Sequence, residues 1–296
     1  MVEELKKLKV GKVIANPEMK KYTTYKVGGP AIALVIPNDV EALIKLLKYL
    51  DDKKIKRKVI GNGSNLIFKD EQYDGVIIKL SEFNNIEVND TIITVGSGYS
   101  LVRLCMKAAK LGLTGLEFAS GIPGTVGGAV FMNAGAYKSD MGYVVSEVKV
   151  IDENYNIKTL YNKDLDFHYR TSFLQKNPNL ICIEVKIVLK HGDSRAIMGV
   201  IEDRKQRRLM SQPLEYPSAG SVFRNPENDY AGRLIEELDY KGKNIGGAYV
   251  SEKHANFIIN KDNATASDVI NLINDIKTKV KDKYNIELKI EQEIVD

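Results

Sequence analysis

The sequence predicts an α+β protein built from three successive parts. Its 296 residues correspond to two domains or to three small ones. Strand and helix patterns alternate over the first 80 residues, strands suited to antiparallel pairing dominate the middle, and a β-α-β-β-α-β order closes the chain. We therefore expect parts at residues 1–80, 81–195 and 196–296. With 44% hydrophobic and 28% charged residues, the chain has the composition of an ordinary globular protein with a sizeable core.

The first part has the pattern of a small β-α-β unit. An apolar run at residues 31–37 predicts a strand, and residues 39–52 carry hydrophobic side chains at helical spacing. Asn38 is predicted to cap this helix, with Glu41 as its partner three residues on. Further strands are expected at residues 57–60, 66–68 and 75–80.

The second part combines a hairpin, a helix and antiparallel strands. Residues 86–88 and 91–95 flank Asn89-Asp90, a turn dipeptide that predicts a hairpin. Ser100 is expected to open a helix that ends near Gly112. Strands are predicted at residues 144–151, 157–160 and 180–189.

The third part begins with a predicted helix at residues 194–210, which carries a basic run at 204–208. Pro213 and Pro217 interrupt the pattern and indicate a hinge. Strands are expected at residues 221–224, 248–251, 256–260 and 286–295, and helices at 231–238 and 267–284. In the last strand, alternation places Glu291 opposite the apolar face, where the simplest interpretation of the residues alone is an exposed carboxylate on an edge strand.

Composition restricts the function classes. A net charge of +4 is too small to argue for nucleic-acid binding. Cys105 and Cys182 are far apart and predict reduced thiols, while the three histidines lack the spacing of metal ligands, so no metal site is expected. We find no signal-peptide pattern and no apolar run near the ~20 residues of a membrane helix, and we expect a cytoplasmic protein.

The strongest local signal is a glycine-rich run at residues 120–136, with five glycines in 17 residues and no acidic or basic side chain. Glycine lets backbone N–H groups approach a ligand closely, so the run suits a phosphate or pyrophosphate, although tight turns alone also produce such density. It matches neither the G-x-G-x-x-G dinucleotide fingerprint nor the P-loop.

A second loop of similar character, Gly61-Asn-Gly-Ser-Asn65, directly follows a predicted strand. By itself Asn-Gly is a common turn dipeptide. Two such loops in neighbouring parts of the chain together predict a site for a ligand with two phosphates.

Two further segments carry polar side chains of open role. Arg170 could pair with a carboxylate or a phosphate, or lie at the surface in an ion pair. Ser221 could donate a proton or cap a turn, and it lacks the G-x-S-x-G context of a hydrolase. The residues alone therefore indicate an anionic ligand but no reaction.

Taken together, the motifs resemble those of the UDP-N-acetylenolpyruvoylglucosamine reductase family, flavoenzymes of peptidoglycan precursor synthesis. The similarity runs from about residue 22 to residue 295. It rests on the segments Thr-Tyr-Lys-Val-Gly-Gly (24–29), Gly-Asn-Gly-Ser-Asn (61–65), Ser-Gly-Ile-Pro-Gly-Thr-Val-Gly-Gly-Ala (120–129), Asn-Ala-Gly-Ala-Tyr (133–137), Tyr-Arg-Thr-Ser-Phe (169–173), Gln-Pro-Leu-Glu-Tyr-Pro-Ser-Ala-Gly-Ser-Val-Phe (212–223), Ala-Gly-Arg-Leu-Ile (231–235) and Ser-Glu-Lys-His-Ala-Asn-Phe (251–257).

The resemblance implies the FAD-binding fold of the vanillyl-alcohol oxidase type, with two FAD-binding subdomains (residues 1–80 and 81–195) and a substrate-binding domain (196–296). It implies noncovalent FAD, NADPH as co-substrate and a small-molecule UDP-sugar substrate, without nucleic-acid, membrane or obligate protein partners. The cofactor-binding residues that it implies are Gly61, Asn62, Gly63, Ser64, Asn65, Ser120, Gly121, Ile122, Pro123, Gly124, Thr125, Gly127, Gly128, Asn133, Ala134 and Gly135.

The resemblance also implies the catalytic roles. Ser221 would give the proton, Arg170 would pair with the substrate carboxylate, and Glu291 would complete the site. Hydride transfer would belong to the flavin. The substrate-binding residues by the same resemblance are Tyr169, Arg208, Arg224 and Asn225.

The chain departs from the family pattern at two positions and is similar to its shorter subclass, which lacks a substrate-covering insertion. Arg224 stands where lysine is frequent, and Gln292 stands where valine is usual. Three other readings stay open: a flavin oxidase of the same fold, a nucleotide-sugar protein without flavin, and a nucleic-acid-binding module resting on the basic run at 204–208.

Overall fold

The computed structural model describes all residues from 1 to 296. The chain forms two compact units. Unit 1 comprises Met1–Ala15, Ala33–Asn62 and Gly75–Lys205, and unit 2 comprises Asn16–Ile32, Gly63–Asp74 and Gln206–Asp296. The predicted limits at residues 80 and 195 stay predictions. In the structure, residues 16–32 and 63–74 belong to the same unit as the C-terminal third.

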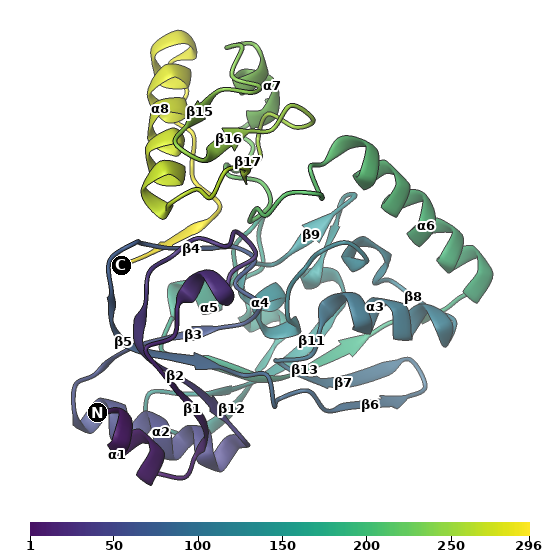
Figure 1. The fold of residues 1–296 in the computed structure, drawn as a ribbon. Helices are drawn as coiled ribbons and strands as arrows, with labels where there is room; N and C mark the ends of the chain where they lie inside the picture. Colours follow the sequence, from purple (N-terminus) through teal and green to yellow (C-terminus); the bar gives the residue numbers. More distant parts are fainter. The chain divides into compact units, whose positions relative to one another are not determined.

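The N-terminal lobe of unit 1 is a four-stranded sheet in the order β1-β2-β5-β3, with two helices (Figure 1). β1 pairs antiparallel with β2, and β3 pairs parallel with β5. The elements are α1 (Val2–Lys7), β1 (Gly11–Ala15), β2 (Ala31–Pro37), α2 (Val40–Asp52), β3 (Lys56–Ile60) and β5 (Tyr73–Lys79). The expected β-α-β unit is therefore present, with an additional N-terminal strand at its edge.

Helix α2 confirms the predicted amphipathic helix but not its cap. Asp39, not Asn38, is the N-cap residue, and its side chain accepts a hydrogen bond from the backbone N–H of Ala42 at 2.8 Å. Both residue types cap well, and the extended backbone conformation falls on Asp39. Leu43, Leu46, Leu47 and Leu50 are fully or almost fully buried in the core of this lobe.

The second lobe of unit 1 is a five-stranded antiparallel sheet in the order β12-β11-β13-β7-β6. The hairpin predicted at Asn89-Asp90 joins β6 to β7 and is confirmed. Ser100 caps α3 through the N–H of Arg103, as expected. The elements are β6 (Ile86–Asn89), β7 (Ile92–Gly96), α3 (Leu101–Lys110), β11 (Val145–Ile151), β12 (Ile157–Tyr161) and β13 (Ile181–Val188).

Short elements fill the connections of this lobe. They are β8 (Leu113–Thr114), a 3₁₀ helix at Glu117–Ala119, α4 (Val126–Phe131), β9 (Gly135–Ala136), β10 (Ser139–Asp140), 3₁₀ helices at Met141–Tyr143 and Asn162–Asp164, α5 (Phe173–Lys176) and β14 (Lys190–His191). Helix α6 (Ser194–Ser211) follows, and the division between the two units falls within it.

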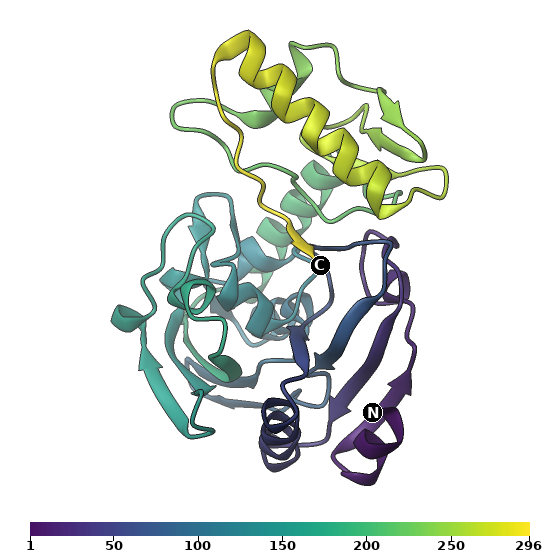
Figure 2. The same ribbon diagram turned by 90° about the vertical axis from the view of Figure 1, so that its left-hand side faces the viewer.

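Unit 2 packs α8 (Ala266–Tyr284) along a small antiparallel sheet, β15 (Asn244–Ile245), β16 (Ala248–Val250) and β17 (Ile258–Asn260), as both ribbon views show (Figures 1 and 2). Thr265 and Asp268 form a capping box at the start of α8. The Asp70 carboxylate accepts from the N–H groups of Ala266 and Ser267, both at 2.8 Å. The other elements are a 3₁₀ helix at Met19–Lys21, β4 (Leu66–Phe68), α7 (Ala231–Glu236) and β18 (Glu293–Val295).

Two predicted strands of unit 2 are wrong in extent. Residues 221–224 form only isolated bridges, from Ser221 to Phe257 and from Phe223 to Ile290. The strand expected over 286–295 is reduced to β18, which pairs parallel with β4. Apolar alternation nevertheless holds, because Leu288 is 1% exposed in the core of unit 2 while its neighbours are exposed. The alternation of apolar and polar residues at 286–290 therefore reflects burial of one side of the segment and not a continuous ladder of backbone hydrogen bonds.

No helix of the structure combines the length and hydrophobicity that a membrane-spanning helix requires.

Candidate active site

The two glycine-bearing loops predicted to form one site, at residues 61–65 and 120–136, meet in unit 1. A Cβ atom on Gly61 would lie 2.4 Å from Oγ1 of Thr125, so no larger residue fits there without displacing Thr125. Thr125 caps α4, and its Oγ1 accepts from the N–H of Gly128 at 3.4 Å. The start of the first loop therefore touches the middle of the glycine-rich run.

A third segment, which the sequence did not indicate, completes this group of loops. The N–H of Gly127 donates to the carbonyl of Ser97 at 2.8 Å, and a Cβ on Gly127 would lie 2.8 Å from Cβ of Ser97. Ser97 is 3% exposed, and its hydroxyl has no hydrogen-bond partner. A buried hydroxyl without a partner is a candidate donor to a ligand.

The electrostatics of these loops suit an anion. Lys79 donates from Nζ to the carbonyl of Gly61 at 2.9 Å, and burial lowers the pKa of its ammonium group. The run at 120–136 contributes no carboxylate. Glycine backbone, a helix start, an ammonium group and a buried hydroxyl are the groups that hold a pyrophosphate, so the residues present fit such a ligand.

Residues 63–65 of the 61–65 motif belong to unit 2. Gly63 has φ +63°, and a Cβ there would lie 2.2 Å from the carbonyl oxygen of Tyr22, so the position requires glycine. Asn65 donates from Nδ2 to the carbonyl of Glu291 at 3.0 Å. This motif therefore also supports the C-terminal segment, a contact that its sequence did not reveal.

In unit 1 the structure brings Arg170 to the end of the glycine-rich run. Nη2 of Arg170 donates to the carbonyl of Gly135 at 2.7 Å. Asn133, 1% exposed, donates to the carbonyl of His168 at 2.8 Å and accepts from the N–H of Gly142 at 2.9 Å. Asn133 and Gly135 thus hold the tight turn that carries Arg170.

Arg170 is half-buried in a conformation that non-glycine residues rarely adopt. Its φ is +54°, at the third position of the turn closed by paired hydrogen bonds between His168 and Thr171. Its guanidinium carbon lies 5.0 Å from the ring centroid of Tyr169, and Gln175 donates to its carbonyl at 3.1 Å. Such strain persists where the surroundings fix a functional side chain. Gln175 was not predicted as a site residue.

In unit 2 the segments of Ser221 and Glu291 lie side by side. The N–H of Glu291 donates to the carbonyl of Val222 at 2.8 Å, and the N–H of Arg224 donates to the carbonyl of Lys289 at 2.9 Å. On the other side, the N–H of Val222 donates to the carbonyl of Asn256 at 2.9 Å. Ser221 is therefore held on a short extended segment between two others.

Asn256 is a supporting residue that sequence reasoning did not assign. It is 3% exposed, accepts from the N–H of Phe223 at 3.0 Å and donates to the carbonyl of Phe223 at 2.8 Å. This paired contact replaces one rung of a sheet. The only sequence signal was its place in the motif at residues 251–257.

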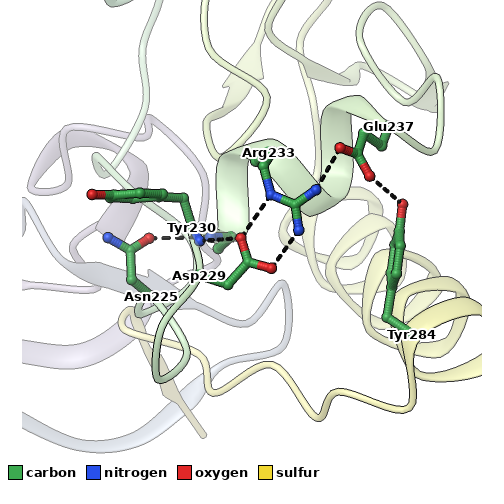
Figure 3. Close-up of polar contacts among 7 residues, drawn as sticks. Asn225, Asp229, Tyr230, Arg233, Glu237 and Tyr284 are labelled. Atoms are coloured by element: carbon green, nitrogen blue, oxygen red, sulfur yellow. Dashed lines mark hydrogen bonds and ion pairs between the residues drawn. The ribbon is translucent and has the colours of Figure 1, made fainter.

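Ser221 opens onto a pocket of ≈ 510 Å³ within unit 2, whose lining includes Asn225, Tyr230, Arg233 and His254. Figure 3 shows one wall, where Arg233 lies between Asp229 and Glu237. Hydrogen bonds to these two carboxylates raise the pKa of Arg233, and Tyr284 donates to Glu237 at 3.1 Å. The guanidinium of Arg233 is therefore bound to carboxylates of the pocket wall itself.

His254 is a further pocket residue without a predicted role. Its Nδ1 accepts from the N–H of Asn256 at 3.2 Å, and its ring lies 4.8 Å from that of Phe257. Burial lowers the pKa of the imidazole, so the ring is neutral at pH 7. With Nδ1 occupied as an acceptor, Nε2 carries the proton and can donate.

The four predicted substrate-binding residues do not all line this pocket. Asn225 lines the pocket and accepts from the N–H of Ala231 at 3.1 Å. Arg224 and Arg208 also belong to unit 2 but are not part of the pocket lining, and Tyr169 belongs to unit 1. Their contacts with a substrate stay predictions.

Comparison with known proteins relates both units to one enzyme family. A model of the UDP-N-acetylenolpyruvoylglucosamine reductase C-terminal domain matches residues 212–295, and a model of an FAD binding domain matches residues 31–160. The chain is 48% identical to the UDP-N-acetylenolpyruvoylglucosamine reductase of Caldanaerobacter subterraneus and 45% identical to that of Bacillus subtilis, covering 100% of this chain and 98% of each relative.

The chain belongs to the UDP-N-acetylenolpyruvoylglucosamine reductase family. The crystal structure of the reductase from Thermus caldophilus agrees, with a TM-score of 0.82 and 34% identity over 96% of this chain and 98% of that one. The predicted family, the α+β class and the FAD-binding fold are thus confirmed. As a member of this reductase family, the chain is an FAD-dependent oxidoreductase.

Proposed function

We propose that this chain reduces the enolpyruvyl group of UDP-N-acetylglucosamine enolpyruvate to give UDP-N-acetylmuramate, with NADPH as the source of electrons, in peptidoglycan precursor synthesis. The observation that carries the proposal is the full-length similarity to reductases of this name. The pairing of the Ser221 and Glu291 segments supports it, because two predicted catalytic residues lie on neighbouring, hydrogen-bonded segments.

FAD is the cofactor, and when bound and reduced it would supply a hydride to the terminal methylene carbon of the enolpyruvyl group. The residues proposed to hold its pyrophosphate in unit 1 are Gly61, Thr125, Gly127 and Gly128, with Lys79 behind them and Ser97 as an additional donor. Glycine at these positions lets the anion approach the backbone closely, and the ammonium group of Lys79 adds a favourable charge.

Ser221 is the proposed proton donor. Hydride addition at one carbon leaves electron density on the neighbouring carbon and its carboxylate. The Oγ–H bond of Ser221 breaks as a C–H bond forms at that carbon, which balances the addition of hydride and proton. A serine hydroxyl is a weak acid, so its position must be fixed for the transfer to compete.

Arg170 is proposed to bind the substrate carboxylate and stabilise the negative charge that develops on it. A guanidinium presents two parallel N–H donors that match a carboxylate. The bond to Gly135 and the left-handed backbone fix its direction before substrate arrives, so little reorganisation is needed during the reaction.

Glu291 is proposed to orient Ser221 and to complete the site. Its backbone position is set by Val222 on one side and by the side chain of Asn65 on the other. The proposal includes a cytoplasmic location, which the two buried free thiols of Cys105 and Cys182 support.

The test has two steps. The purified protein should be yellow, release FAD on denaturation and be bleached by NADPH under anaerobic conditions. Addition of UDP-N-acetylglucosamine enolpyruvate should then restore the flavin colour with formation of UDP-N-acetylmuramate. Bound flavin that NADPH reduces but this substrate never reoxidises would refute the proposal. A protein purified without flavin would instead favour the alternative of a nucleotide-sugar protein that uses no flavin.

Ser221→Ala separates the half-reactions. Reduction of the flavin by NADPH should continue, while reoxidation by the substrate should be lost. Loss of both half-reactions in a folded Ser221→Ala variant would contradict the role given to Ser221.

A further inference from the structure

Gln292 makes three contacts with the segment that leads into Ser221. Its side chain is buried, with the residue 4% exposed. Nε2 lies 3.2 Å from the carbonyl oxygen of Ala219, 3.1 Å from that of Gly220 and 3.4 Å from that of Ser221. One amide group therefore faces three consecutive carbonyl oxygens.

The chemistry of these partners fixes the orientation of the amide. Rotation by 180° would place Oε1 against three other oxygens, so only the arrangement with Nε2 inward is favourable. Oε1 itself is buried without a hydrogen-bond partner. An unpaired buried oxygen is costly, and an apolar side chain would avoid the cost.

The segment that Gln292 contacts turns at Gly220. Gly220 has φ +75°, and a Cβ there would have no atom within 4 Å. Backbone contacts hold this segment on both sides, because the N–H of Asn260 donates to the carbonyl of Pro217 at 2.9 Å and Ser221 forms a bridge with Phe257. Gln292 follows Glu291 directly, so the same stretch of chain holds the Ser221 segment by one backbone bond and one side-chain amide.

We propose that Gln292 is a positioning residue, which fixes the backbone of residues 219–221 and thereby the direction of the Ser221 hydroxyl. The proposal rests on the proposed function, in which Ser221 gives the proton. It predicts that Gln292 acts on the proton-transfer step alone and leaves binding and reduction of the flavin unchanged.

Gln292→Met tests this role, because methionine has a similar length and volume but no donor. Flavin reoxidation by UDP-N-acetylglucosamine enolpyruvate should slow by about 10- to 100-fold, the range expected when a catalytic group is misplaced by a fraction of an ångström to 1 Å. The rate of flavin reduction by NADPH and the substrate Kd should stay within about twofold of wild type, since these steps do not use the hydroxyl direction. The solvent deuterium isotope effect on reoxidation should increase as proton transfer becomes slower.

Gln292→Glu gives a readout that a general loss of packing would not produce. Its carboxyl group can donate one hydrogen bond to these carbonyls, and only when protonated, and burial beside oxygen atoms raises its pKa. Glu291 and Glu293 flank it in the chain and favour the protonated form further. The ratio of variant to wild-type reoxidation rates should therefore rise as the pH falls.

Asn162→Leu is the matched control in unit 1. Nδ2 of Asn162 also donates to two carbonyl oxygens, those of Gly142 at 2.9 Å and Val145 at 2.7 Å, but it has no contact with the Ser221 segment. This variant should lose stability without slowing reoxidation.

The outcomes separate the two proposals. If wild type is reoxidised by the substrate and Ser221→Ala is not, the proposed function stands. In that case the positioning role alone is overturned by either of two results. One is reoxidation of Gln292→Met at the wild-type rate, and the other is a ratio of Gln292→Glu to wild-type reoxidation rates that does not change with pH. If Gln292→Met does not fold, the pH dependence of Gln292→Glu decides. If the substrate fails to reoxidise wild type, the proposed function itself is refuted.

Discussion

The side chain of Asn65 donates a hydrogen bond to the backbone carbonyl of Glu291 at 3.0 Å, across 226 residues of sequence. The motif that the sequence assigned to the cofactor therefore also anchors the segment that carries a predicted catalytic carboxylate. Within unit 2, Asn65 supports Glu291 from one side while Val222 supports it from the other.

Asn65→Ala should slow substrate-dependent flavin reoxidation by about tenfold, because the Glu291 backbone loses the hydrogen bond to its carbonyl. It should also lower the free energy of unfolding by about 1–3 kcal/mol, since a part-buried carbonyl loses its donor. Stopped-flow reoxidation and urea unfolding measure the two effects. A variant that binds FAD weakly yet reoxidises at the wild-type rate would assign Asn65 to the cofactor instead.

Gly61→Ala should weaken FAD binding by about tenfold or more and destabilise the fold by about 1–3 kcal/mol, because the new methyl group overlaps Oγ1 of Thr125. Titration of the apoprotein with FAD gives the affinity. Adding Thr125→Ala to Gly61→Ala should recover part of the loss.

Gly199→Ala provides the matched control. Gly199 lies inside α6, and a Cβ there would have no atom within 4 Å. This substitution should raise stability by about 0.5–1 kcal/mol without changing FAD affinity. Equal effects at Gly61 and Gly199 would show that close contact with Thr125 does not matter.

Arg170→Lys should lower kcat/KM for the enolpyruvyl substrate by about 100-fold, because an ammonium group keeps the charge but not the fork that binds a carboxylate. Flavin reduction by NADPH should be unaffected. Arg195→Lys, on the exposed surface of α6, should behave as wild type. Wild-type turnover by Arg170→Lys would show that only charge is required at this position.

His254 should make unfolding pH-dependent. Burial lowers its pKa in the folded protein below the reference value of 6.5, so the unfolded chain binds the proton more tightly. The stability from this group is present above pH 6.5 and is lost as the pH falls toward the folded-state pKa. Urea unfolding at about pH 7.5 and 5.5 should show a smaller loss for His254→Gln than for wild type. An identical loss in both would contradict the shift.

Helices and the hairpin could be predicted because their signals are local. Residues 39–52 and 267–284 carry apolar side chains at helical spacing, and α2 and α8 occur there within one residue at each end. Ser100 as a cap and Asn89-Asp90 as a turn were also correct, because both act within a few residues of themselves.

Predictions that depended on distant partners were less accurate. The alternating residues 286–290 do not continue into one long strand, because the end of the chain changes partner. Residues 289–291 pair with residues 222–224, whereas β18 pairs with β4. A strand is defined by the strand beside it, and that choice is not encoded in local spacing.

The sequence alone determined the family, the positions of the glycine loops and the identities of Arg170, Ser221 and Glu291 as candidates, because these depend on residue type and order along the chain. Only the tertiary structure decided that Gly61 touches Thr125, that Asn65 holds Glu291, and that Gln292 faces three carbonyl groups. Each of these contacts joins residues more than 60 positions apart, and such distant contacts are set by packing of the whole chain around its cores rather than by local propensity.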